Sequence, residues 1–531
     1  NITFPNVHKI GSLSFQYDDG ITDINWPSVL YVGPNAFFMC TNLFSVDLKN
    51  CLSIDIGGFY YCSKLLYIYL PKLKKLGSYA FAHSSVLNIE LNNVVDLDQI
   101  EDKGSQFYNC NKLTQVTMKK VTTISIHMFN NCSKLSKVDM PNITKIYKYA
   151  FYKCHSLNSI SFPKVSFIDE NAFQECISIR KIDLSRVESI PSYAFQGCTN
   201  LFSVELVNCQ KIGSFAFHNC NGLSNINLPK LKCLGKSAFE NTGIREIEFN
   251  SLTQIDPSNG YQFNNCNKLT HATLKNILTI EVSMFACCSN LIYIDTPNVT
   301  TIDNSAFLLC VSLYNITFPK VSLIENNAFA NDENIKSINL PSVQQIFNYA
   351  FTYCINLFEV NLENCIILKT GSFANCIKLR HINFPNLLVI GEKTFSNTSL
   401  SKVELNSVIS LQKFSYFSNS GGHFANSMKL THVTMKNVTS IDINMFYNCP
   451  NLIYVDMPNA TTIGQNAFKG CDLFNCFSFP KVTSIDDNAF QGNPSITEIE
   501  FPTVETISLY SFQGCLNLVS VNFENCISNS F

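Results

Sequence analysis

The sequence predicts a repeat solenoid of about 23 units of 22 residues, in which short coils of chain stack on one another. The main observation is a phenylalanine that recurs every 22 residues, with three longer steps of 26, 24 and 29 residues. A 22-residue unit cannot bury a core alone, so its apolar side chains leave water only against the next unit. Each such side chain contributes about 1.5–3 kcal/mol when fully buried. We therefore expect one solenoid over residues 1–531 rather than three or four globular domains. The recurring residues are Phe15, Phe37, Phe59, Phe81, Phe107, Phe129, Phe151, Phe173, Phe195, Phe217, Phe239, Phe263, Phe285, Phe307, Phe329, Phe351, Phe373, Phe395, Phe424, Phe446, Phe468, Phe490 and Phe512.

Every unit repeats one pattern when positions are counted from its phenylalanine. Cys tends to stand at +3, Leu at +6, Ile or Val at +9, Leu or Phe at +11, Pro at +12, Val at +14, Ile at +17 and Ala at +21. The alternation that ends at +11 predicts a strand. Proline lacks the N–H that a strand ladder needs, so +12 ends that strand. The unit at Phe151 carries the full pattern: Cys154, Leu157, Ile160, Phe162, Pro163, Val165, Ile168 and Ala172.

A longer period of seven units lies above the first. Near copies begin at Gln106, Gln262 and His423, which divides the chain into blocks of roughly 1–103 (partial), 104–259, 260–420 and 421–531 (partial). The three irregular steps fall at the same place in each block. There a unit loses one residue between its phenylalanine and its strand, and a longer loop follows. These loops are either interaction sites or tolerated insertions inherited by block duplication.

Composition excludes several classes of protein. Lys and Arg total 38 and Asp and Glu 40, so the net charge of −2 favours neither nucleic acid nor an anionic membrane as partner. No run of about 18 apolar residues is present, so we expect no membrane insertion. The chain has no initiator Met and no secretory signal, and we interpret it as a processed or excised piece.

Nothing in the sequence points to catalysis, a cofactor or a metal. Motifs of hydrolases, metalloproteases and nucleotide-binding folds are absent, and the nine His are scattered. Sixteen of the 23 Cys occupy +3, without metal-ligand spacing or obvious pairing, so we expect buried free thiols. Such thiols suit a reducing or anaerobic setting. Trp26 at +11 is expected in the core, and the sequons at Asn142, Asn298 and Asn459 share position +13.

The pattern closely resembles the BspA-like (Treponema-type) leucine-rich repeat surface protein family. The resemblance rests on the A-F-x-x-C-x-x-L and I/L/F-P-x-V-x-x-I segments and on L-x-x-I-x-L at +6 to +11, and it covers essentially the whole chain. The usual N/C site falls at +14, where Val is common and Cys51, Cys209, Cys365 and Cys526 occur. The resemblance implies a right-handed superhelix with a parallel β-sheet on its concave face. It also implies a surface adhesin, although the free thiols leave a cytoplasmic location open.

Two columns that line this sheet are the candidate binding stripe. Position +10 is Asp, Glu, Asn, Thr, Ser or Tyr and never Lys or Arg, while +8 is mixed. An acidic and amide stripe favours a cationic or polyhydroxyl partner. The alternative is a face kept polar for solubility and against edge pairing. The candidates are Asp47, Tyr67, Tyr69, Glu90, Asp139, Asp183, Glu205, Glu248, His271, Tyr293, Asp295, Glu404, His432, Tyr454, Asp456 and Glu500.

Two functions follow from this reading. The first is a non-enzymatic scaffold that recognises a host or matrix protein or glycan at a cell surface, through several weak contacts at once. The second is a structural protein that self-associates end to end or forms part of a longer array.

Overall fold

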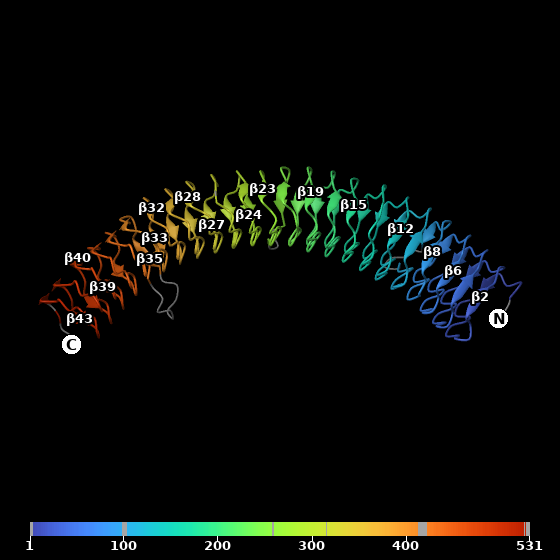
Figure 1. Ribbon diagram of the computed structural model, residues 1–531, viewed down its shortest axis with the longest axis horizontal. Helices are drawn as coiled ribbons and strands as arrows, with labels where there is room; N and C mark the ends of the chain where they lie inside the picture. The colour runs from blue at the N-terminus through green and yellow to red at the C-terminus, as the bar shows by residue number, and fades with distance from the viewer. Residues whose placement is uncertain are drawn as a thin grey trace. The chain divides into compact units, whose positions relative to one another are not determined.

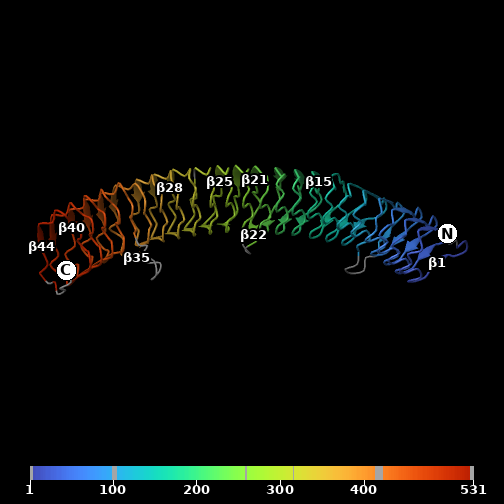
Figure 2. The same cartoon turned by 60° about the horizontal axis from the view of Figure 1, so that its bottom comes forward.

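The computed structural model describes residues 4–97, 104–256, 260–314, 316–412, 422–524 and 526. The chain divides into two compact units, residues 1–269 and 270–531. Within each unit consecutive coils lie side by side, and the described residues contain strands and turns but no helix (Figures 1 and 2). The prediction of a parallel-strand solenoid is confirmed. A single continuous solenoid across both units stays a prediction.

A typical coil contributes two short strands. We call the strands at +8 to +10 front strands and those near +16 and +17 back strands. Proline at +12 and the turn after it separate the two, as the sequence predicts. In the first unit the front strands are β2 (Asp23–Asn25), β4 (Ser45–Asp47), β6 (Tyr67–Tyr69), β8 (Asn88–Glu90), β10 (Gln115–Thr117), β12 (Lys137–Asp139), β15 (Lys181–Asp183), β17 (Ser203–Glu205), β19 (Asn225–Asn227) and β21 (Glu246–Glu248). Its back strands are β1 (Lys9–Ile10), β3 (Tyr31–Val32), β5 (Ser53–Ile54), β7 (Lys75–Leu76), β9 (Asp96–Leu97), β11 (Thr123–Ile124), β13 (Lys145–Ile146), β14 (Phe167–Ile168), β16 (Ser189–Ile190), β18 (Lys211–Ile212), β20 (Cys233–Leu234) and β22 (Gln254–Ile255).

The second unit repeats this plan. Its front strands are β23 (His271–Thr273), β25 (Tyr293–Asp295), β28 (Ser337–Asn339), β30 (Glu359–Asn361), β32 (His381–Asn383), β34 (Lys402–Glu404), β36 (His432–Thr434), β38 (Tyr454–Asp456), β40 (Cys476–Ser478), β42 (Glu498–Glu500) and β44 (Ser520–Asn522). Its back strands are β24 (Thr279–Ile280), β26 (Thr301–Ile302), β27 (Leu323–Ile324), β29 (Gln345–Ile346), β31 (Ile367–Leu368), β33 (Val389–Gly391), β35 (Ser410–Gln412), β37 (Ser440–Ile441), β39 (Thr462–Ile463), β41 (Ser484–Ile485) and β43 (Thr506–Ile507).

All pairing is parallel and joins equivalent positions of neighbouring coils, as in Asp47 opposite Tyr69 and Thr434 opposite Asp456. The back strands pair over long runs, for example from β24 to β35 in the second unit. The front strands pair in shorter groups. The coil at Phe151 departs from the predicted strand, because it contributes only an isolated bridge between Ser159 and Lys137.

The phenylalanine turn forms a third row of contacts between coils. N–H groups at −2, 0 and +2 donate to the next coil, as Asn35 does to Ile56, Phe37 to Gly58 and Met39 to Tyr60, at 2.8–2.9 Å. The backbone reaches φ of 49° at Asn35 and 63° at its counterpart Gly57, a left-handed conformation that Asn and Gly adopt most readily. This explains why Asn recurs around the phenylalanine.

The predicted shared core is confirmed. The recurring phenylalanines from Phe37 to Phe490 are buried, and rings of consecutive coils stack at 5.0–6.0 Å between centroids within each unit, as Phe173, Phe195 and Phe217 do at 5.1 and 5.4 Å. Trp26 is 1% exposed, as expected. The inserted loops that the sequence predicts lie partly outside the described residues, which omit 98–103, 257–259 and 413–421.

Candidate functional site

The front strands carry all sixteen predicted stripe residues, and none of their side chains is buried. The inward residue between each +8 and +10 pair is mostly buried, as Val138 and Ile294 are. Alternation along a strand therefore turns +8 and +10 outward. The two most exposed aromatic residues of the stripe are Tyr67 and Tyr69, at 54% and 57%. The structure thus brings the predicted residues onto one face of each unit.

Some side chains on this face form hydrogen bonds or ion pairs with the neighbouring coil. Asn383 donates to Asn361 at 2.8 Å, and Asn361 donates to Asn339 at 3.3 Å. Lys119 reaches Asp139 at 2.5 Å in an exposed ion pair. Such ladders support the interpretation that some +10 residues serve the stack itself.

Two pairs of coils in the second unit carry identical outward side chains. One pair presents His271 beside Tyr293, with ring centroids 6.2 Å apart, and the other presents His432 beside Tyr454 at 6.0 Å. The +10 positions are Thr and Asp in both pairs, and among the described residues the side-chain carboxylates of Asp295 and Asp456 make no hydrogen bond.

The histidines in both pairs have the same local partner. His271 Nδ1 lies 3.0 Å from Thr270 Oγ1, and His432 Nδ1 lies 2.9 Å from Thr431 Oγ1. In the second pair, burial and then the Asp456 carboxylate raise the pKa of Tyr454. The same outward arrangement is therefore built twice.

The repeat pattern and the stacked parallel strands agree with a family model described as the BspA type leucine rich repeat region (6 copies). It matches residues 1–103, 74–202, 188–314, 300–423 and 420–530. The chain belongs to the BspA-type leucine-rich repeat family. No curated protein matches the chain.

Solved structures of leucine-rich repeat proteins resemble this one at low identity. A leucine-rich repeat protein from Bacteroides ovatus ATCC 8483 is 24% identical, covers 67% of this chain and 82% of its own, and has a TM-score of 0.44. A leucine rich cell surface protein from Faecalibacterium prausnitzii A2-165 is 18% identical, covers 90% and 89%, and has a TM-score of 0.23.

The cysteines of this leucine-rich repeat chain are free, as predicted, and 18 of the 23 are buried. The +3 thiols donate to the phenylalanine carbonyl of the preceding coil, as Cys154 does to Phe129 and Cys198 to Phe173, both at 3.1 Å. Burial raises the pKa of Cys198 to about 12, so its thiol stays protonated and unreactive at neutral pH. The described residues contain no group of three His, Cys, Asp or Glu that could hold a metal ion.

The repeat pattern alone did not single out Asp332 in the +3 column. Asp332 stands at +3, where its neighbours are Cys310 and Cys354, and it is fully buried. Burial raises the pKa of the Asp332 carboxyl well above its usual range, so it is held neutral. The signal was available in the sequence, because an ionisable residue had replaced a core thiol.

The sequons also have a structural use within the leucine-rich repeats. Asn142 Nδ2 donates to the Lys119 carbonyl at 2.8 Å, and its Oδ1 accepts from Lys164 Nζ at 2.7 Å. Asn298 and Asn459 do the same with their own neighbours. The nitrogen that would carry a glycan is thus engaged in the folded coil. Among the described residues no helix is long and apolar enough to cross a membrane.

Proposed function

We propose that this protein is a non-enzymatic binding scaffold that recognises a protein or glycan on a cell or matrix surface through its front strands. One observation carries the proposal. His271, Tyr293 and Asp295 recur unchanged as His432, Tyr454 and Asp456, while the inward neighbours Ala272 and Ile294 become Val433 and Val455. Packing constrains the inward side chains and leaves the outward ones free. Identity on the outward side therefore points to recognition.

The decisive variant reverses charge at the equivalent position of each block: Asp139→Lys, Asp295→Lys and Asp456→Lys together. Asp139 is only partly exposed in a surface ion pair, so the cost in stability stays below about 1 kcal/mol per site. Several contacts act at once, so we expect the triple variant to bind cells or matrix-coated surfaces at least tenfold more weakly.

A matched control carries the same change of charge away from the front strands. Glu188, Glu333 and Glu505 are exposed and lie outside these strands, so Glu188→Lys, Glu333→Lys and Glu505→Lys together should leave binding intact. Unchanged binding by the front-strand variant, or equal loss in both variants, would contradict the proposal.

A further inference from the structure

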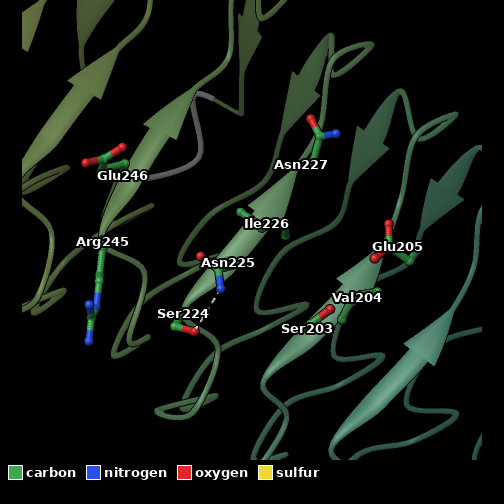
Figure 3. A pocket seen from close by; sticks show the side chains of 9 residues that line it. All are labelled: Ser203, Val204, Glu205, Ser224, Asn225, Ile226, Asn227, Arg245 and Glu246. Carbon is green, nitrogen blue, oxygen red and sulfur yellow. Dashed lines mark hydrogen bonds between the residues drawn. The ribbon is translucent and has the colours of Figure 1, made fainter.

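Among the described residues, hollows open on the front strands at the same place in three successive blocks. The first, of about 660 Å³, lies between β6 and β8 and is lined by Tyr67, Tyr69 and Glu90. The second, of about 480 Å³, is lined from β17, β19 and β21 by residues that include Glu205, Asn225 and Glu246 (Figure 3). The third, of about 280 Å³, is lined by residues that include Asn383, Lys402 and Glu404.

Each hollow lies where a coil has lost one residue. The coils that begin at Phe81, Phe239 and Phe395 reach their front strands one position early. The front groups β2–β4–β6, β15–β17–β19 and β28–β30–β32 each end just before such a coil. The back strands still pair across the same join, as β7 does with β9, β20 with β22 and β33 with β35. At these three joins the front strands part while the back strands stay paired; the front strands also part between β40 and β42, which belong to regular coils.

The break also removes hydrogen bonds between coils. In many regular coils that the structure describes, although not at Leu206 or Met457, the N–H at +11 donates to the +10 carbonyl of the next coil, as Leu48 does to Tyr69 at 3.1 Å and Leu362 to Asn383 at 3.1 Å. Among the described residues, no such bond joins Leu70 to Glu90 or Phe384 to Glu404. The backbone N–H and C=O groups that lack these bonds at the floor of a hollow need water or a ligand as their hydrogen-bond partner.

The shortened coils share a second departure from the repeat. The residue that follows the front strand by two is Asn instead of Pro, which gives Glu90 with Asn92, Glu248 with Asn250 and Glu404 with Asn406. Asn92 Nδ2 donates to Glu90 Oε1 at 3.1 Å, and Asn250 Nδ2 donates to Glu248 Oε1 at 2.7 Å. Asn92 Oδ1 is buried without a hydrogen-bond partner in the first hollow. An amide thus holds a carboxylate in position at the first two breaks, and of these two carboxylates that of Glu90 lines a hollow.

The lining chemistry narrows the class of ligand. A metal cation would need several converging oxygen ligands, but Arg245 lines the second hollow and Lys402 the third. An anion would meet a glutamate in every hollow. A neutral saccharide suits both constraints, because its hydroxyl groups donate to carboxylates and accept from amide and cationic N–H groups. Its C–H faces can also pack on the exposed rings of Tyr67 and Tyr69.

We propose that the three hollows are saccharide subsites, one at each shortened coil. This inference deepens the proposed function, on which it rests, by naming the ligand class and the positions that hold it. The two larger hollows, of about 480 and 660 Å³, fall within the range of about 300–1,000 Å³ of ordinary small-ligand pockets, and the third, of about 280 Å³, lies just below it.

The test uses the full chain on an array of immobilised oligosaccharides. Arms with neutral, sulfated and sialylated glycans are read with and without added calcium. We expect binding to neutral glycans that does not require calcium. Binding confined to anionic glycans, or binding that calcium alone confers, overturns the assignment, as does an array without any bound glycan.

Two triple variants locate the subsites. Glu90→Gln, Glu246→Gln and Glu404→Gln remove a charge from each hollow and keep the side-chain size, and we expect at least tenfold weaker glycan binding because charged hydrogen bonds are lost. Glu188→Gln, Glu333→Gln and Glu505→Gln make the same change at exposed residues outside the front strands and outside the lining residues given for the hollows, and should bind as the unmodified chain does.

The pattern of results separates this inference from the proposed function. Equal loss of glycan binding in both triple variants, or no loss in either, rejects the hollows as subsites. If cells or matrix still bind and the charge reversal at Asp139, Asp295 and Asp456 weakens that binding, the front-strand function stands without the saccharide subsites. If neither experiment shows binding through this face, both fail.

Discussion

Asp332 provides a direct test of what stabilises the core of the solenoid. It occupies a column in which Cys310 and Cys354 donate their thiol hydrogens to Phe285 and Phe329, at 3.1 and 3.3 Å. Asp332 is fully buried, and neither of its carboxyl oxygens makes a hydrogen bond. Leaving a buried polar group without a partner costs about 1–3 kcal/mol. Asp332→Cys should recover that amount and add a thiol bond to the Phe307 carbonyl.

The pH dependence of this gain has a definite sign. Burial raises the pKa of Asp332 in the folded chain above its unfolded value of 3.8, so the neutral carboxyl is the form that the fold favours. Its contribution to stability is fully present below pH 3.8 and is lost as the pH rises towards the folded pKa. The advantage of Asp332→Cys should therefore be smaller at pH 4 than at pH 7.

Native-state hydrogen exchange read by mass spectrometry is the suitable assay, because a solenoid opens locally and a global unfolding midpoint averages over many coils. The opening free energy of amides between Phe329 and Cys354 should rise in Asp332→Cys. Asp332→Asn removes the charge but keeps a buried polar group, so it should abolish the pH dependence with a smaller gain. Equal protection in all three proteins at pH 7, or a gain independent of pH, would refute the reasoning.

Two further predictions concern the core and the thiols. Phe195→Ala removes a ring that stacks on Phe173 and Phe217, so we expect a loss of about 3–5 kcal/mol in the local opening free energy. Phe202→Ala, at a residue that is 46% exposed, should change it by less than about 0.5 kcal/mol, and similar losses in the two would contradict the stacked core. Alkylation of the native protein at pH 8, mapped by peptide mass spectrometry, should label exposed Cys476 rapidly and Cys198 barely, because burial raises the Cys198 pKa to about 12. Comparable labelling of the two would show that the +3 cysteines are accessible to the reagent in the folded protein.

The sequence by itself determined the repeat, the shared core and the outward position of the stripe. The 22-residue period of phenylalanine predicts stacked coils, because so short a unit buries its apolar residues only against the next unit. Alternation then assigned Asp139 and Tyr293 to the outward face, where the structure has them. The +3 cysteines were likewise predictable as buried thiols from their uniform column.

Only the tertiary structure decided what the irregular coils do. A missing residue before Asn88 or Lys402 is visible in the sequence, but its effect depends on which row of strands absorbs the change in length. The structure shows that the back strands stay paired while the front strands part. The hollows form because the front strands rather than the back strands lose their pairing. The hydrogen bonds of a strand ladder join neighbouring coils, so the sequence of one coil does not specify which of these bonds break.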